Sequence, residues 1–144
     1  MCWVLYLASD VPLPTIDWDP ERPAFNVESI PRSETPVSRQ FARQHIYIAG
    51  SHTLCGCGFD RNQANPDHPE ELPAAEKSLR ALREYLRQAV AIASEIELYS
   101  CWDGDQAREP DHRWVMTPED IRPTTMGWFP DRTYAAVREV DSRM

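Results

Sequence analysis

Cysteine and histidine are concentrated in one short stretch of the sequence, where Cys55 and Cys57 flank a single glycine and His52 precedes them. The other two cysteines are Cys2 and Cys101. Thiolate and imidazole groups are ligands that zinc prefers in proteins. The sequence therefore contains a candidate zinc site formed by His52, Cys55, Cys57 and Cys101.

Two other interpretations fit the same residues, and the sequence alone leaves them open. Zinc sites usually pair their cysteines as C-x-x-C, whereas this chain has C-x-C. A thiol-based enzyme or redox protein would use Cys55 or Cys57 as its nucleophile, with His52 as the base. In the third interpretation the cysteines are small hydrophobic residues, and the loop is structural or binds a partner without covalent chemistry.

Predicted secondary structure explains how these distant residues would meet. Alternating apolar residues predict a strand over 45–49, apolar residues at helical spacing predict a helix over about 73–94, and alternation returns over 95–102. Such a strand, helix, strand unit, from about 45 to 102, normally joins parallel neighbours. Both strands would then end at the same end of the sheet, where open sheets bind ligands.

Polar and aromatic residues beside these strand ends are candidate ligand-binding residues. Ser51 follows the first strand, and Trp102 and Asp103 end the second. If the N-terminal strand runs in the same direction, Ser9 and Asp10 join them. The positive N-terminus of the predicted helix lies where the long loop arrives, and it would lower the pKa of a nearby thiol.

The remaining segments predict a single domain over 1–144 of α+β class, with α/β as the alternative. The fold would be a small mixed sheet with one principal helix on one face. Prolines exclude regular structure from most of 11–36, apart from a short edge strand over 25–30, and 34–44 has weak helical character. Further strands are expected over 113–116 and 133–140, with a short helical turn over 117–120. In the strand over 95–102, Glu97, Tyr99 and Cys101 share a face that is expected to be polar.

Charge and targeting signals limit the partners. The net charge of −8 argues against nucleic acid, and no stretch is apolar enough to span a membrane. The apolar N-terminal segment lacks the preceding positive charge and the cleavage site of a signal peptide, so a cytosolic protein with reduced thiols is expected. Acidic residues over 103–111 are expected to form a solvated turn. The partner is expected to be a small molecule or a protein, and the oligomeric state stays open.

Three stretches carry a resemblance. The segments GSHTLCGCGF, LASDVPLP and ELYSCWDGD resemble a group of short bacterial proteins of unknown function. The resemblance implies that the cysteine loop and the CWDGD turn occur together as a unit, and it carries no activity. The functional hypothesis is a bacterial cytosolic protein with a Cys/His cluster at one end of its sheet.

Overall fold

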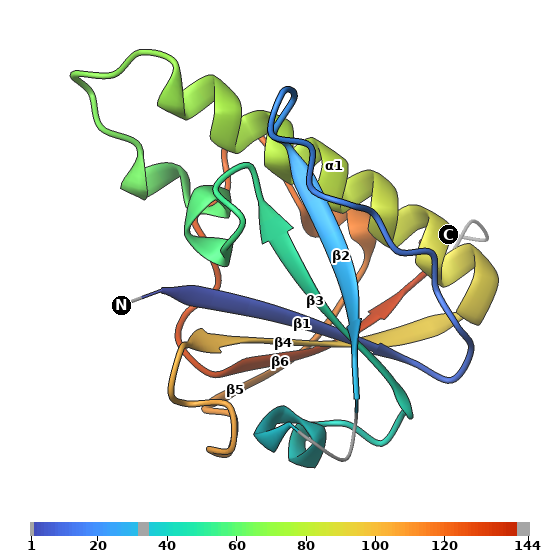
Figure 1. Ribbon diagram of the computed structural model, residues 1–144. Helices are drawn as coiled ribbons and strands as arrows, with labels where there is room; N and C mark the ends of the chain where they lie inside the picture. Colours follow the sequence, from blue (N-terminus) through green and yellow to red (C-terminus); the bar gives the residue numbers. More distant parts are fainter. Residues whose placement is uncertain (1, 32–34, 141–144) are drawn as a thin grey trace.

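The computed structural model describes residues 2–31 and 35–140 and shows a six-stranded mixed sheet with one long helix (Figure 1). The predicted α+β class is confirmed. The strands are β1 (Trp3–Ser9), β2 (Phe25–Ile30), β3 (His45–Ser51), β4 (Glu95–Trp102), β5 (His112–Met116) and β6 (Thr133–Arg138). The helices are α1 (Glu71–Ala93) and the 3-10 helices η2 (Pro36–Gln40), η3 (Gly56–Phe59), η4 (Arg61–Gln63) and η5 (Pro118–Asp120). Among the described residues, no helix is both long and apolar enough to cross a membrane.

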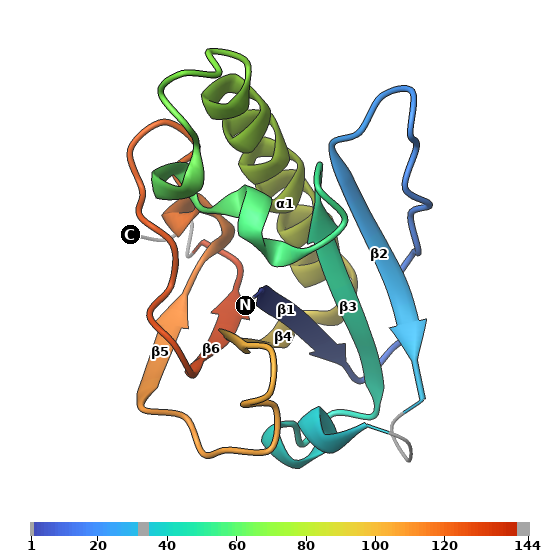
Figure 2. The same cartoon turned by 60° about the vertical axis from the view of Figure 1, so that its left-hand side comes forward.

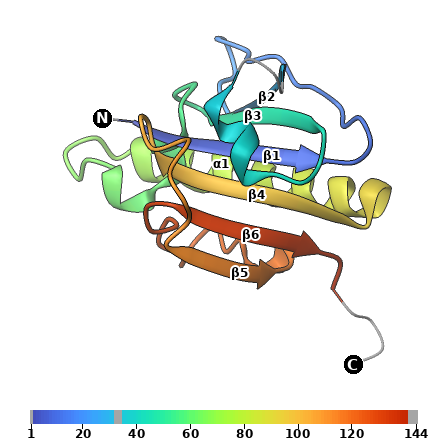
Figure 3. The ribbon, with the colours of Figure 1, turned by 90° about the horizontal axis from the view of Figure 1, so that it is seen from below.

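The order of the strands corrects one detail of the predicted strand, helix, strand unit. The order is β2-β3-β1-β4-β6-β5, and Figure 3 shows it with α1 passing behind the sheet. β1 lies between β3 and β4 and is antiparallel to both. The strands β3 and β4 are therefore parallel, as expected, but they are not neighbours. Their carboxyl ends meet the beginning of β1, where Trp3 lies opposite Trp102.

The direction of β1 moves two candidate residues to the opposite end of the sheet. Ser9 lies opposite His45, the first residue of β3, and Asp10 forms an ion pair with Arg43. The expectation that Ser9 and Asp10 join the cysteine loop is therefore wrong, because β1 runs opposite to β3. The same reversal brings Cys2 to the end of the sheet where β3 and β4 finish.

Helix α1 covers one face of the sheet, as Figure 2 shows from the side. The predicted apolar stripe is confirmed, because Leu79, Leu82, Leu86 and Val90 are buried in the main core. Each such side chain contributes roughly 1.5–3 kcal/mol when it is fully buried. The helix ends at Ala93, and the next residue, Ser94, has a φ of 68° that turns the chain directly into β4.

The opposite face of the sheet holds a second, smaller core. Tyr99 and Cys101 of β4 are buried there against Val37 and Phe41, which η2 and the residue after it supply. The expectation of a polar face on β4 is wrong, because this short 3-10 helix covers it. Glu97 is also buried, and its carboxylate accepts hydrogen bonds from the Arg43 backbone and from the hydroxyl of Tyr134.

Candidate functional site

Three cysteine side chains meet where β1 begins and β3 ends. Cys2 precedes β1, Cys55 directly precedes η3, and Cys57 belongs to η3. Their three sulfur atoms all lie within 4.8 Å of one another. Figures 1 and 2 both place η3 beside the start of β1. We call Cys2, Cys55 and Cys57 the cysteine cluster.

Short-range hydrogen bonds shape the loop that carries two of these cysteines. The backbone N–H and the hydroxyl of Ser51 both donate to the Cys55 carbonyl, over 3.0 and 2.7 Å. Leu54 has a φ of 73°, and its N–H donates to the Ser51 carbonyl over 3.0 Å. Ser51 is fully buried, so the structure gives this candidate ligand-binding residue a role in holding the loop.

The glycine between Cys55 and Cys57 lets the loop lie directly against β1. A Cβ atom on Gly56 would stand 2.8 Å from the carbonyl oxygen of Trp3. Real Cβ atoms essentially never approach another atom so closely. The C-G-C spacing therefore brings both thiols to the first residues of β1, and this close approach is what places Cys2 beside them.

Burial and hydrogen bonds shift the pKa values of the Cys55 and Cys57 thiols in opposite directions. Burial alone would raise the pKa of Cys55, but hydrogen bonds from Thr53, from the backbone and thiol of Cys57 and from the thiol of Cys2 outweigh it and lower the pKa. Burial raises the pKa of Cys57 to about 11, although its sulfur accepts a hydrogen bond from the Trp3 N–H over 3.2 Å. Cys55 is therefore the thiol of this pair that ionises first.

His52 lies outside the cysteine cluster and lines a separate hollow of about 240 Å³. Its Nδ1 is 2.9 Å from the hydroxyl oxygen of Ser78. That hydroxyl donates its single proton to the Ala24 carbonyl over 2.7 Å, so it accepts from the histidine. His52 therefore carries its proton on Nδ1 and leaves the Nε2 lone pair free of this contact.

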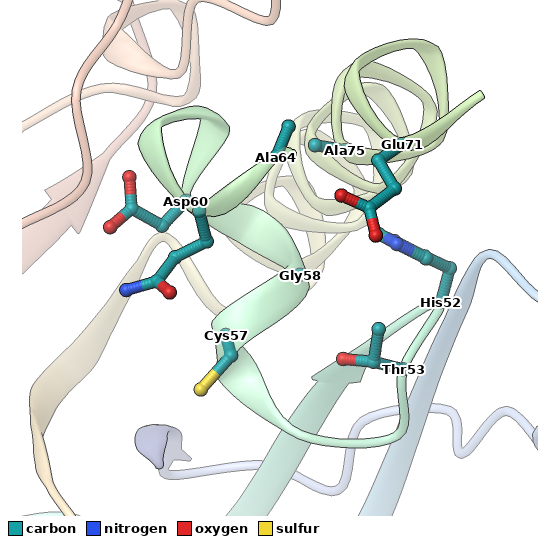
Figure 4. A pocket seen from close by; sticks show the side chains of 9 residues that line it. His52, Thr53, Cys57, Gly58, Asp60, Ala64, Glu71 and Ala75 are labelled. Atoms are coloured by element: carbon teal, nitrogen blue, oxygen red, sulfur yellow. The ribbon is translucent and has the colours of Figure 1, made fainter. Parts of the chain in front are cut away.

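The hollow beside His52 has an acidic lining. Asp60 and Glu71 line it together with Cys57, and Figure 4 shows the side chains of His52 and Glu71 pointing toward one another. Burial lowers the pKa of His52, while the charge of Glu71 acts in the opposite direction. The imidazole is thus kept neutral near pH 7, as a base or a ligand must be. In the same view the sulfur of Cys57 points away from His52.

Cys101 does not belong to the cysteine cluster either. It is fully buried in the smaller core, and burial raises the pKa of its thiol to about 12. The structure therefore brings together only Cys55 and Cys57 of the four predicted metal ligands. It adds Cys2, which the sequence reasoning did not include because the direction of β1 was unknown.

Two further candidates lie beside the cluster. The ring of Trp102 stacks on Trp3 with 3.8 Å between the ring centroids and 16° between the planes. The N–H of Asp103 donates to the Cys2 carbonyl over 2.8 Å. These contacts join the CWDGD turn to the cysteine loop through the first residues of β1. The structure therefore provides a physical link between the two segments that the resemblance pairs.

The acidic turn that follows has its own partners. Asp105 pairs with Arg108 and Asp111 pairs with Arg132, as expected for a solvated turn. Over the part of the chain that the structure describes, the cysteine cluster is the only group of three or more potential metal ligands gathered within 4.8 Å.

Comparisons with known proteins give no match: no family model fits the sequence, and no curated protein or solved structure is significantly similar to it. The fold and the cysteine cluster are therefore the basis for proposing a function.

Proposed function

We propose that the protein binds a zinc ion through the thiolates of Cys2, Cys55 and Cys57 and leaves the fourth coordination position open. The observation that carries this proposal is the approach of the three sulfur atoms to within 4.8 Å of one another. Cys2 is more than fifty residues away from Cys55 and Cys57 in the sequence, so the fold and not local sequence brings it to them.

The geometry needs little adjustment to hold the ion. Zn–S bonds of about 2.3 Å in a tetrahedron place the sulfur atoms about 3.8 Å apart. Each sulfur therefore has to move by about 1 Å or less. The Trp3 N–H already donates to the Cys57 sulfur, and the Cys57 N–H to that of Cys55. Such bonds to sulfur support thiolate ligands from outside the coordination shell.

Cysteine used only for packing is present elsewhere in the chain and differs from the cluster. Cys101 is completely buried among apolar and aromatic side chains. Cys2 is exposed, and Cys55 and Cys57 are half-buried. Exposed thiols contribute little to a core, so the contrast favours a chemical role for the cluster. Zinc binding would also require reduced cysteines, in keeping with the expectation of a cytosolic protein.

Metal content tests the proposal. Protein purified with any affinity tag at its C-terminus, so that Cys2 is unperturbed, should retain one zinc ion per chain by elemental analysis. Replacing zinc with cobalt should produce a thiolate-to-metal charge-transfer band. Cys2→Ser, Cys55→Ser and Cys57→Ser should each lower the metal affinity by at least about tenfold, whereas Cys101→Ser is the matched control and should bind normally. A wild-type protein that takes up neither metal would overturn the proposal.

A specific observation also favours thiol chemistry as a second candidate function. The pKa of Cys55 is lowered while that of Cys57 is raised to about 11, and both lie beside the exposed Cys2. Such a set provides one nucleophilic thiolate and two thiols that can resolve a disulfide. In this case metal-free protein should be alkylated at Cys55 well before Cys57 below pH 8. Equal, slow alkylation of both would contradict it.

A further inference from the structure

A second hollow, of about 310 Å³, adjoins the cysteine cluster, and His52 is not among its lining residues. Its apolar part comes from the neighbouring strands β1 and β3 and includes Val4 and Ile48, together with Trp3, Tyr6 and Ala49. Cys2 and Cys55 line it as well, and of the described residues that line it Asp103 alone carries a charged side chain. The volume is at the lower end of the range for small-molecule sites.

Two of the three cluster cysteines face this hollow, and the third does not. Cys57 lines the other hollow, beside His52, and its sulfur is engaged by the N–H of Trp3. Trp3, whose N–H contacts the Cys57 sulfur, would therefore lie behind an ion held by all three sulfur atoms. The open coordination position of the ion would face the hollow lined by Cys2 and Cys55.

Asp103 is held next to this position by the backbone. Its N–H donates to the carbonyl of Cys2 over 2.8 Å, and one carboxylate oxygen, Oδ1, accepts from the side chain of Gln106 over 2.6 Å. The other oxygen, Oδ2, makes no hydrogen bond with any residue that the structure describes. Among the residues that the structure describes, none of those lining the hollow is basic. A ligand here would meet a carboxylate that can accept a hydrogen bond from a cation.

We propose, on the basis of the zinc site above, that this hollow binds a small aminothiol, with its sulfur on the metal and its ammonium group on Asp103. A soft thiolate suits a site already built from thiolates. Three thiolates and Zn²⁺ carry a net charge of −1, and a fourth thiolate makes it −2, so a ligand that also carries a positive charge is favoured. Its methylene groups would lie on Val4 and Ile48.

The binding step is a ligand exchange without oxidation or reduction. The thiol loses its proton to the solvent, its sulfur forms a bond to zinc, and the zinc–oxygen bond to water breaks. The released water and proton enter the solvent, and the protein cysteines keep their oxidation state.

The experiment compares two thiols of equal chain length on zinc-loaded and cobalt-loaded protein. Cysteamine carries an ammonium group where 2-mercaptoethanol carries a hydroxyl group. These thiols also differ in acidity. The quantity measured is therefore the affinity for cysteamine divided by the affinity for 2-mercaptoethanol, and this ratio is compared between the wild type and Asp103→Asn. Asn keeps the shape of the side chain and an acceptor for Gln106. An exposed ion pair of this kind should give the wild type a ratio about threefold to fivefold larger than that of the variant.

Asp105→Asn is the matched control, because it removes the same charge two residues away from a side chain that does not line the hollow. It should leave the ratio at the wild-type value. An unchanged ratio in Asp103→Asn, or metal-loaded protein that binds neither thiol, would overturn this inference while the zinc site stands. Protein that takes up no metal would instead overturn the proposed function itself.

Discussion

Replacing Gly56 with alanine tests whether the cysteine loop and β1 form one site. The new Cβ would stand 2.8 Å from the Trp3 carbonyl oxygen, whereas ordinary contacts begin at 3.4 Å. Trp3 or the loop must therefore move by about 0.6 Å, and the atom in the way is backbone, which yields less easily than a side chain. Overpacking of this kind costs about 1–3 kcal/mol of unfolding free energy. The sulfur atoms already have to approach one another by up to about 1 Å to bind zinc, and this displacement would increase that distance.

We therefore expect Gly56→Ala to weaken zinc binding by at least about tenfold, because the displacement separates Cys2 from Cys55 and Cys57. Competition with a chromophoric chelator measures the affinity, and urea unfolding of the metal-free protein measures the stability. Gly127→Ala is the control, since its Cβ would meet nothing closer than Asn62 Nδ2 at 3.9 Å. A destabilised Gly56→Ala variant with wild-type zinc affinity would refute the reasoning that Cys2 is a ligand.

Three further outcomes are expected. Cys101→Ala should cost about 1 kcal/mol of stability in chemical denaturation, because it removes a buried sulfur, yet leave the zinc stoichiometry at the wild-type value. Metal-free protein should lose stability as the pH rises above 9, because the unfolded thiols ionise near pH 9 while the folded Cys57 and Cys101 keep their protons to about pH 11 and 12. Below pH 9 the lowered pKa of Cys55 acts in the opposite direction, so denaturation above pH 9 should show the fall, and Cys101→Ala should reduce its slope. Ser78→Ala should cost about 1–3 kcal/mol, since the Ala24 carbonyl loses its donor, and ¹⁵N NMR of wild-type His52 should show the proton on Nδ1.

Local patterns in the sequence predicted the elements of this fold well. The stripe from Leu79 to Val90 identifies α1, because a helix that covers a sheet must bury one face. Alternation identifies β3 and β4, although the covered face of β4 was misread. Glu97 looks like a solvent-facing residue in the sequence, but hydrogen bonds from the Ala42 and Arg43 backbone and from the Tyr134 hydroxyl compensate for the burial of its carboxylate.

Cys55 and Cys57 could be predicted as parts of the site, but Cys2 could not, because the residues that reach the site depend on the direction of β1. An apolar run such as 3–8 is compatible with either direction, and no short turn connects β1 to a neighbour to decide between them. Had β1 been parallel to β3, Asp10 would lie beside the cysteine loop and Cys2 at the far end. The cysteine before the strand was the available signal, and its meaning depended on long-range pairing.

The central position of β1 also determines when the site can form during folding. Trp3 pairs with Trp102, so β1 and β4 are joined across 99 positions of the chain (102 − 3). Contacts of such high sequence separation form slowly, because a long loop must close before they are made. During synthesis β1 emerges first but has to wait for β4 before both of its edges are paired. A bound ion would therefore indicate that β1 has paired with its neighbours in the sheet. Metal uptake should follow folding instead of nucleating it.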